Sequence, residues 1–203
     1  MYTTVEEIAA LQAAAMLTTA RVGDPEEDAS MAAMRGVLSK INALGFVTVD
    51  SQTGAKESGP LHWQRAYISG FVPKSLAKEF VAQMNLRNSV VALAFPHGEE
   101  QPAGGRAFAW KKMPRLSLTL EARHETCTSH PLAVAQPFRG MWRAMLPELG
   151  LADDRRSMRA VAEDAVQVFV TDTVWGRKTA LFKAACECLR LAHSRARGGR
   201  PEV

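Results

Sequence analysis

The sequence predicts a single α+β domain, in which helices flank a mixed β-sheet of about five to six strands. Apolar residues recur at helical spacing near both ends of the chain, whereas central segments alternate between apolar and polar residues as strands do. A strand pattern, a helical pattern and a second strand pattern also follow one another between residues 64 and 95. This succession is typical of a βαβ unit.

Two helices are predicted at the N-terminal end. Thr4 and Glu7 have the spacing of a capping box, and apolar residues then follow at helical spacing. Residues 24–27 (Asp-Pro-Glu-Glu) predict a second helix start, because a cap residue precedes a proline and two carboxylates. Gly45 is expected to end this second helix, since glycine readily adopts the left-handed conformation found at helix ends.

The central segments predict two strands, a helix and a buried strand. Residues 46–52 and 64–72 have strand patterns and are separated by a polar loop. Ser75 is predicted to cap a helix that ends near residues 85–88. Residues 89–95 are uninterrupted and apolar, which suits a strand buried on both faces. We expect the strands at 64–72 and 89–95 to form a right-handed βαβ unit with this helix.

The second half of the chain predicts three further strands and three helices. The strands are expected at residues 106–110, 115–123 and 166–170, and the helices at residues 137–145, 155–165 and 178–193. We expect residues 1–194 to form one domain and residues 195–203 to form a disordered basic tail.

Composition favours a soluble cytoplasmic protein. A hydrophobic content of 47% with 23% charged residues is typical of globular domains and excludes general disorder. The sequence has no apolar run of the roughly 20 residues that span a bilayer, and its start lacks a signal-peptide pattern. Three cysteines outside any CxxC motif suggest reduced thiols. We therefore expect no membrane partner.

A polar cluster is predicted at the loop end of the hairpin formed by the first two strands. We assume an antiparallel register with Gln52 opposite Gln64, which sets Ser51 opposite Arg65. Directly opposed side chains lie about 5 Å apart at Cβ. This register gathers a carboxylate, a hydroxyl, two amides and a guanidinium, from Asp50, Ser51, Gln52, Gln64 and Arg65. Such a set suits a small polar or anionic ligand. Alternatively, these residues only supply turn chemistry.

A second candidate cluster lies at residues 171–178, between the last predicted strand and the last predicted helix. Turns of this kind often carry ligand contacts, because the N-terminus of a helix attracts anions. Asp172, Trp175 and Arg177 are the candidates here, with Arg177 joining Arg65 on an anionic group and Asp50 as a candidate acid or base. Alternatively, Asp172 is only a helix cap and Trp175 only fills the core.

Both clusters fall within a sequence resemblance. Residues 42–52 (NALGFVTVDSQ) and 64–71 (QRAYISGF) resemble a family of uncharacterised proteins found in actinobacteria such as streptomycetes, with similar proteins in phages and large DNA viruses. The family pattern also has a late Asp-x-Val-Trp-Gly-Arg, matched by residues 172–177. Where the family has Pro-Gly after Ser-Gln, this chain has Thr53-Gly54. The family is a domain of unknown function, so the resemblance implies no activity; it implies that the two clusters share one site.

Other functional signals are weak. His124, Cys127 and His130 have three-residue spacing, but a structural zinc site needs four ligands, so no metal site is expected. The sequence has no phosphate-binding glycine loop, HExxH or GxSxG, and no nucleophile–base pair is apparent. The sequence therefore identifies no reaction type and no cofactor.

An alternative function is a non-catalytic module that binds protein or nucleic acid. Residues 110–115 combine a tryptophan with Lys111, Lys112 and Arg115, and the C-terminal arm is also basic. The same charges on an edge strand serve equally to prevent aggregation. A third alternative is a structural subunit of a larger assembly, and the sequence predicts no oligomeric state.

Overall fold

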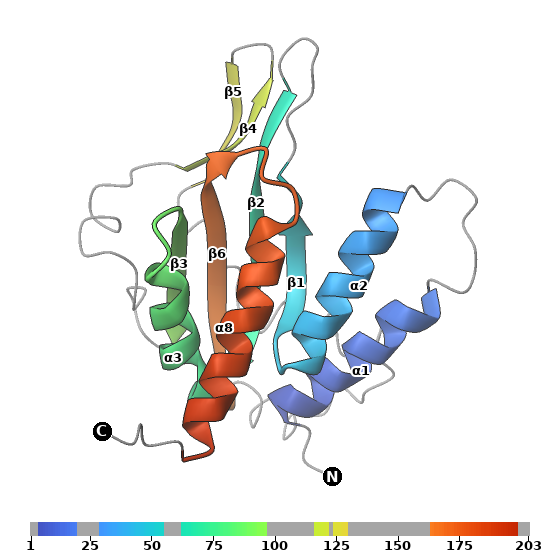
Figure 1. Cartoon of the computed structure of the whole chain (residues 1–203), viewed down its shortest axis with the longest axis vertical. Coiled ribbons are helices and arrows are strands. Elements are labelled where there is room, and N and C mark those ends of the chain that lie inside the picture. Colours follow the sequence, from blue (N-terminus) through green and yellow to red (C-terminus); the bar gives the residue numbers. More distant parts are fainter. Residues whose placement is uncertain are drawn as a thin grey trace.

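The computed structural model describes residues 4–19, 29–54, 62–96, 116–121, 124–129 and 163–198. Within these ranges the helices are α1 (Val5–Thr19), α2 (Ala29–Ala43), α3 (Lys74–Asn85) and α8 (Ala180–Ala196). The strands are β1 (Val47–Gln52), β2 (His62–Pro73), β3 (Val90–Pro96), β4 (Leu116–Glu121), β5 (His124–Ser129) and β6 (Ala165–Trp175) (Figure 1). The predicted α+β class is confirmed.

The centre of the domain is a four-stranded antiparallel sheet in the order β3-β6-β2-β1. The first three residues of β2 continue beyond this sheet and pair with β4, which pairs with β5. Every described pairing is antiparallel, so the expected mixed sheet is wrong. β2 and β3 do run in the same direction on either side of α3, but β6 lies between them. The unit is therefore βαβ-like, without a parallel strand pair.

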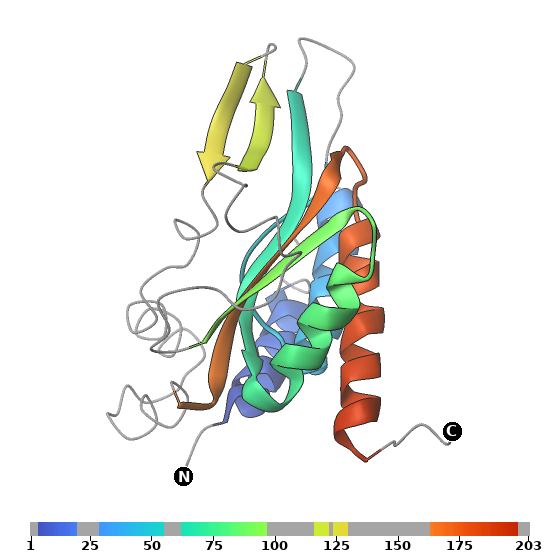
Figure 2. The same cartoon turned by 90° about the vertical axis from the view of Figure 1, so that its left-hand side faces the viewer.

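Helices α2, α3 and α8 lie side by side on one face of the sheet, here called the helical face (Figures 1 and 2). Helix α1 packs against α2 and beside β1. The core fills the space between the helical layer and the sheet, and includes Leu76, Phe80 and Met84 of α3 and Leu181, Phe182 and Leu189 of α8. Burying one such side chain contributes about 1.5–3 kcal/mol. The opposite face, here called the back face, is also buried at its centre, at Phe71, Leu93 and Phe169.

The predicted start of α1 and the predicted end of α2 are confirmed. Thr4 and Glu7 form the capping box, with Glu7 N–H donating to Thr4 Oγ1 at 3.1 Å and Thr4 N–H donating to Glu7 Oε2 at 2.9 Å. Gly45 ends α2 with a φ of +86°. Buried Asn42 then fixes β1 to α2, because its Oδ1 accepts hydrogen bonds from Thr48 N–H and Thr48 Oγ1 at 3.0 and 2.8 Å. The predicted helix start at residues 24–27 lies outside the described residues.

The second half differs from the prediction in three places. β6 begins at Ala165, which we assigned to a helix, and continues through residues 171–175, which we assigned to a turn. Its threonines, Val174 and Trp175 favour strands strongly enough to outweigh the polar residues. Residues 124–129, for which we predicted no strand, form β5. Helix α8 continues to Ala196, so Arg195 is helical rather than part of a tail, and it pairs with Glu79.

Several predicted segments lie outside the described residues. They are the strand at 106–110, the helix at 137–145, most of the helix at 155–165 and the end of the basic tail at 199–203. Within the described part of the chain, no helix is long and apolar enough to cross a membrane.

Candidate functional site

The register between β1 and β2 differs from the one we assumed. Gln52 lies opposite Tyr67, and Asp50 lies opposite Ser69, so the pairing is offset by three residues from the predicted Gln52–Gln64 pair. Gly70 explains part of this offset, because a Cβ at that position would lie 2.0 Å from the carbonyl oxygen of Val47. Only glycine allows this close approach of the two backbones. An irregularity between Thr48 and Asp50 shifts the register further.

The new register brings Asp50 and Tyr67 together on the back face. The Tyr67 phenol donates a hydrogen bond to Asp50 Oδ2 at 2.9 Å, and its ring stacks on Phe169 with centroids 6.0 Å apart. Gln52 lies on the same face, because residues two apart in a strand point to the same side. Ser51 lies opposite Ile68, a residue of the main core, and therefore faces the helical side. Asp50 is exposed and Tyr67 is half-buried.

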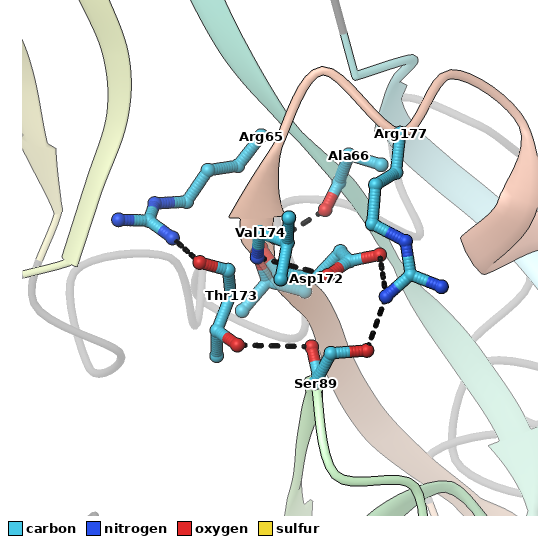
Figure 3. A network of polar contacts seen from close by, with 8 residues as sticks. Arg65, Ala66, Ser89, Asp172, Thr173, Val174 and Arg177 are labelled. Atoms are coloured by element: carbon cyan, nitrogen blue, oxygen red, sulfur yellow. Dashed lines mark hydrogen bonds and ion pairs between the residues drawn. The ribbon is translucent and has the colours of Figure 1, made fainter.

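Arg65 is held rigidly at the end of the same face. It lies opposite Trp175 in the β2–β6 ladder, and its guanidinium carbon is 4.0 Å from the centre of the Trp175 ring. Its Nη1 donates to the backbone oxygen of Thr173 (Figure 3). Strand alternation places Arg65 on the same side of β2 as Tyr67, about 7 Å along the strand. The backbone of Gln64, the remaining candidate of the hairpin, pairs with Thr119 of β4.

Five residues thus form what we call the back-face patch: Asp50, Gln52, Arg65, Tyr67 and Trp175. Four of them were predicted site residues. Tyr67 was missed, although its position two residues after Arg65 in an alternating strand already places the two side chains on one face.

Asp172 and Arg177 lie on the other side of β6, in what we call the turn network. Asp172 is 1% exposed, and its Oδ1 accepts a hydrogen bond from Val174 N–H at 2.9 Å. Its Oδ2 lies 3.4 Å from Arg177 Nη1, and Arg177 also donates to Ser89 Oγ. The Ser89 backbone oxygen accepts from Thr173 N–H at 2.7 Å. Figure 3 shows Arg65 and Arg177 pointing to opposite sides of β6.

The turn network has a structural role that its contacts explain. A buried carboxylate is costly unless it is paired and hydrogen-bonded, and Asp172 has both a backbone donor and a guanidinium. Arg177 and Ser89 in turn connect the start of α8 to the start of β3. The two arginines that we expected on one anionic group are therefore separated by a strand.

The two predicted clusters nevertheless meet through the backbone. Gly54, just after β1, and Lys178, just before α8, form an antiparallel β-bridge. The Gly54 N–H donates to the Lys178 oxygen with a nitrogen–oxygen distance of 3.2 Å, and the Lys178 N–H donates to the Gly54 oxygen at 2.8 Å. A Cβ on Gly54 would lie 2.9 Å from the backbone nitrogen of Arg177. Only glycine therefore allows the two backbones to approach so closely here. Lys178 has a φ of +47°, which is uncommon for a residue with a side chain.

The described residues place no metal centre at the patch, and Cys186 and Cys188 are not activated thiols. In the ranges that the structure describes, no group of three or more His, Cys, Asp or Glu residues is placed to hold a metal ion. Cys186 and Cys188 are buried in α8, and burial raises the pKa of both thiols. Buried thiols of raised pKa are poor nucleophiles at neutral pH.

A family model matches the first half of the chain. The family described as "Domain of unknown function (DUF6919)" matches residues 3–106. This range runs from the capping box of α1 past the end of β3, and it includes Asp50, Gln52, Arg65 and Tyr67. No curated protein matches the chain.

Proposed function

The chain belongs to the DUF6919 family of domains of unknown function, and we propose that it binds a small molecule with an anionic group at the back-face patch. The observation that carries this proposal is the fixed position of Arg65. Its guanidinium stacks on Trp175 and donates to the Thr173 carbonyl oxygen. A cation held in this way loses little conformational freedom when it binds a partner, which favours affinity.

The chemistry of Arg65 selects the anionic group. A guanidinium is planar, is always charged in proteins and presents a fork of N–H donors that matches a carboxylate or a phosphate. Its position over the indole and its hydrogen bond to the Thr173 carbonyl oxygen restrict the orientation of this fork. An approaching anion therefore meets a cation of defined orientation.

Asp50 and Tyr67 supply a second recognition element on the same face. The Tyr67 phenol orients the Asp50 carboxylate through the 2.9 Å hydrogen bond, and Asp50 is exposed to solvent. A carboxylate in this position accepts hydrogen bonds from a hydroxyl or an amine of the ligand. Arg65 lies two residues before Tyr67 in β2, so a cation and a carboxylate are offered on the same face, which suits a phosphorylated or carboxylated metabolite that also carries hydroxyl or amino groups.

The same contacts have an alternative interpretation, in which Arg65 only stabilises the end of β6 through Trp175 and Thr173 and binds no ligand. A thermal-shift screen of phosphorylated and carboxylated metabolites separates the two. Binding at a hundredfold excess over Kd raises apparent stability by about 2.7 kcal/mol. We expect at least one compound to raise the melting temperature of the natural chain and not that of Arg65→Ala.

Two further variants make this experiment decisive. Arg190→Ala removes an exposed arginine from α8, far from the patch in sequence, and should leave the response intact. Asp50→Asn changes an exposed side chain, so it should fold normally while weakening the response. If Arg65→Ala responds like the natural chain, or if both patch variants simply unfold, the patch is structural and the proposal is wrong.

We also propose a cytoplasmic location and relatives in actinobacteria and phages. The first rests on cysteines that form no CxxC motif and, for Cys186 and Cys188, lie buried as free thiols. The second rests on the sequence resemblance of residues 42–52 and 64–71. Detection of the reduced protein in the soluble cytoplasmic fraction of its host tests the location.

A further inference from the structure

The three helices of the helical face carry a large excess of positive charge. Together α2, α3 and α8 contain seven lysines and arginines but only two acidic residues, Glu79 and Glu187. The neighbouring helix α1 has the opposite character, since Glu6 and Glu7 are its only charged residues. Among the four described helices, the positive charge is therefore concentrated on the three that cover this face of the sheet.

Both acidic side chains of this layer are already neutralised. Glu79 forms an ion pair with Arg195 of α8, and Glu187 forms one with Arg87 at 2.7 Å. Of the six other lysines and arginines in these helices, Arg35 is half-buried and five are exposed. The five are Lys40 of α2, Lys74 and Lys78 of α3, and Lys183 and Arg190 of α8. None of the five makes an ion pair within the part of the chain that the structure describes.

The five cations lie on three helices that pack against one another. Lys183 and Arg190 are seven residues apart, which is two helical turns or about 10 Å along α8. Helix α8 contacts both α2 and α3, so the charges of the three helices are carried by neighbouring elements. The Glu79–Arg195 ion pair joins the middle of α3 to the end of α8, and Lys74 and Lys78 belong to the first half of α3. Figure 1 shows the three helices adjacent to one another.

From this arrangement we propose that the helical face binds the phosphate backbone of a nucleic acid. The cations are spread over three helices, so one small anion reaches only one or two of them. A polyanion reaches several at once, and duplex DNA carries one charge per about 1.7 Å of its axis. Binding of this kind is independent of base sequence and steeply dependent on salt.

An anionic membrane surface fits the same charges less well. Helices that lie on membranes insert a row of large apolar residues between the lipid headgroups. The apolar residues of α3 and α8 are instead mostly buried in the core. Within the described lengths of α2, α3 and α8 and their caps, the exposed large apolar residues are only Leu191 of α8 and Leu86 at the C-cap of α3, which do not form a row. The surface therefore offers charge without an apolar anchor.

Fluorescence anisotropy with labelled single-stranded RNA, single-stranded DNA and duplex DNA tests the proposal on the full chain. We expect binding at low salt, with log K falling linearly as log salt concentration rises. Four or five phosphate contacts give a slope of about −3 to −4. The double variant Lys183→Glu with Arg190→Glu should bind at least tenfold more weakly and lower the magnitude of the slope by about 1.5 or more.

Two matched variants show whether position or charge alone matters. Lys183→Arg with Arg190→Lys preserves both charges and should bind like the natural chain. Lys111→Glu with Lys112→Glu makes the same change in net charge at the other basic segment of the sequence, and should have a much smaller effect. Absence of binding at low salt, equal losses in the two charge-reversed variants, or binding to anionic vesicles without binding to nucleic acid would each overturn the proposal.

Discussion

Tyr67 and Asp50 are joined by a 2.9 Å hydrogen bond between strands, although they are not directly opposite each other in the ladder. Asp50 lies opposite Ser69, and Tyr67 reaches it diagonally from two residues away. This contact holds an exposed carboxylate at a fixed distance from the strand that carries Arg65. The hydrogen bond therefore places polar side chains of β1 and β2 next to each other on the back face.

Replacing Tyr67 with phenylalanine isolates the contribution of this hydrogen bond. The ring and its stacking on Phe169 remain, but Asp50 loses its partner. We expect a loss of about 0.5–1.5 kcal/mol in the free energy of unfolding, because the bond is solvent-accessible at one end. Urea denaturation measures this change. If our proposal is correct, the response to ligands in the thermal-shift screen falls further than this small loss of stability explains.

Asp172 should contribute more to stability than any exposed residue of the patch. Asp172→Ala leaves the Val174 N–H without its acceptor and removes the carboxylate that pairs with Arg177. We expect a loss of about 1–3 kcal/mol, since Arg177 is half-exposed and water compensates part of the ion pair. Ser89→Ala removes one contact of the same network and serves as the milder comparison. Equal stability of Asp172→Ala and the natural chain, by chemical denaturation, would contradict the structural role.

The backbone bridge between Gly54 and Lys178, which joins the two clusters, depends on the small size of Gly54. Gly54→Ala adds a Cβ at 2.9 Å from the Arg177 nitrogen, and overpacking of this kind costs about 1–3 kcal/mol. Gly36→Ala is the matched control, because Gly36 lies within α2 and nothing is within 4 Å of an added Cβ there. Alanine in that helix should stabilise the domain by about 0.5–1 kcal/mol. Melting temperatures that move in the same direction for both variants would count against the junction.

The buried thiols make stability dependent on alkaline pH. Burial raises the pKa of Cys186 and Cys188 above the ordinary value of 9.0, so the unfolded chain loses these protons at lower pH than the native chain does. Stability should therefore be unaffected below that value and should fall as pH rises above it. Denaturation of the Cys127→Ser variant between pH 7 and 10 measures the slope. Adding Cys186→Ala and Cys188→Ala should reduce it, and an unchanged slope would exclude the thiols as its cause.

The sequence predicts the local elements better than their arrangement. Thr4, Glu7 and Gly45 act through neighbours in the chain, so their roles follow from local spacing. The β1–β2 register depends instead on contacts between segments, above all the close approach of Gly70 to the Val47 carbonyl. Insertion of β6 between β2 and β3 is likewise a long-range event, which a strand–helix–strand pattern cannot reveal.

Four of the eight predicted site residues lie in the back-face patch, and their geometry was not predicted. Asp50, Gln52, Arg65 and Trp175 do lie on one face, yet the assumed pairing of Ser51 with Arg65 would have produced a different patch. A one-residue change in register reverses the face of every side chain. Asp172 of β6 and Arg177, just after β6, lie on the opposite side of the strand from the patch. The side that each residue faces depends on how side chains alternate along an irregular strand.

The indole N–H signal of Trp175 in ¹H–¹⁵N NMR spectra gives the most direct measurement of the central claim, because Trp175 touches Arg65. The signal is assigned with Trp175→Phe and followed during titration with the strongest compound from the screen. We predict that it shifts in a saturable manner in the natural chain and in Arg190→Ala, and stays fixed in Arg65→Ala. A compound that binds while leaving this signal unmoved in the natural chain would contradict a ligand site at the back-face patch.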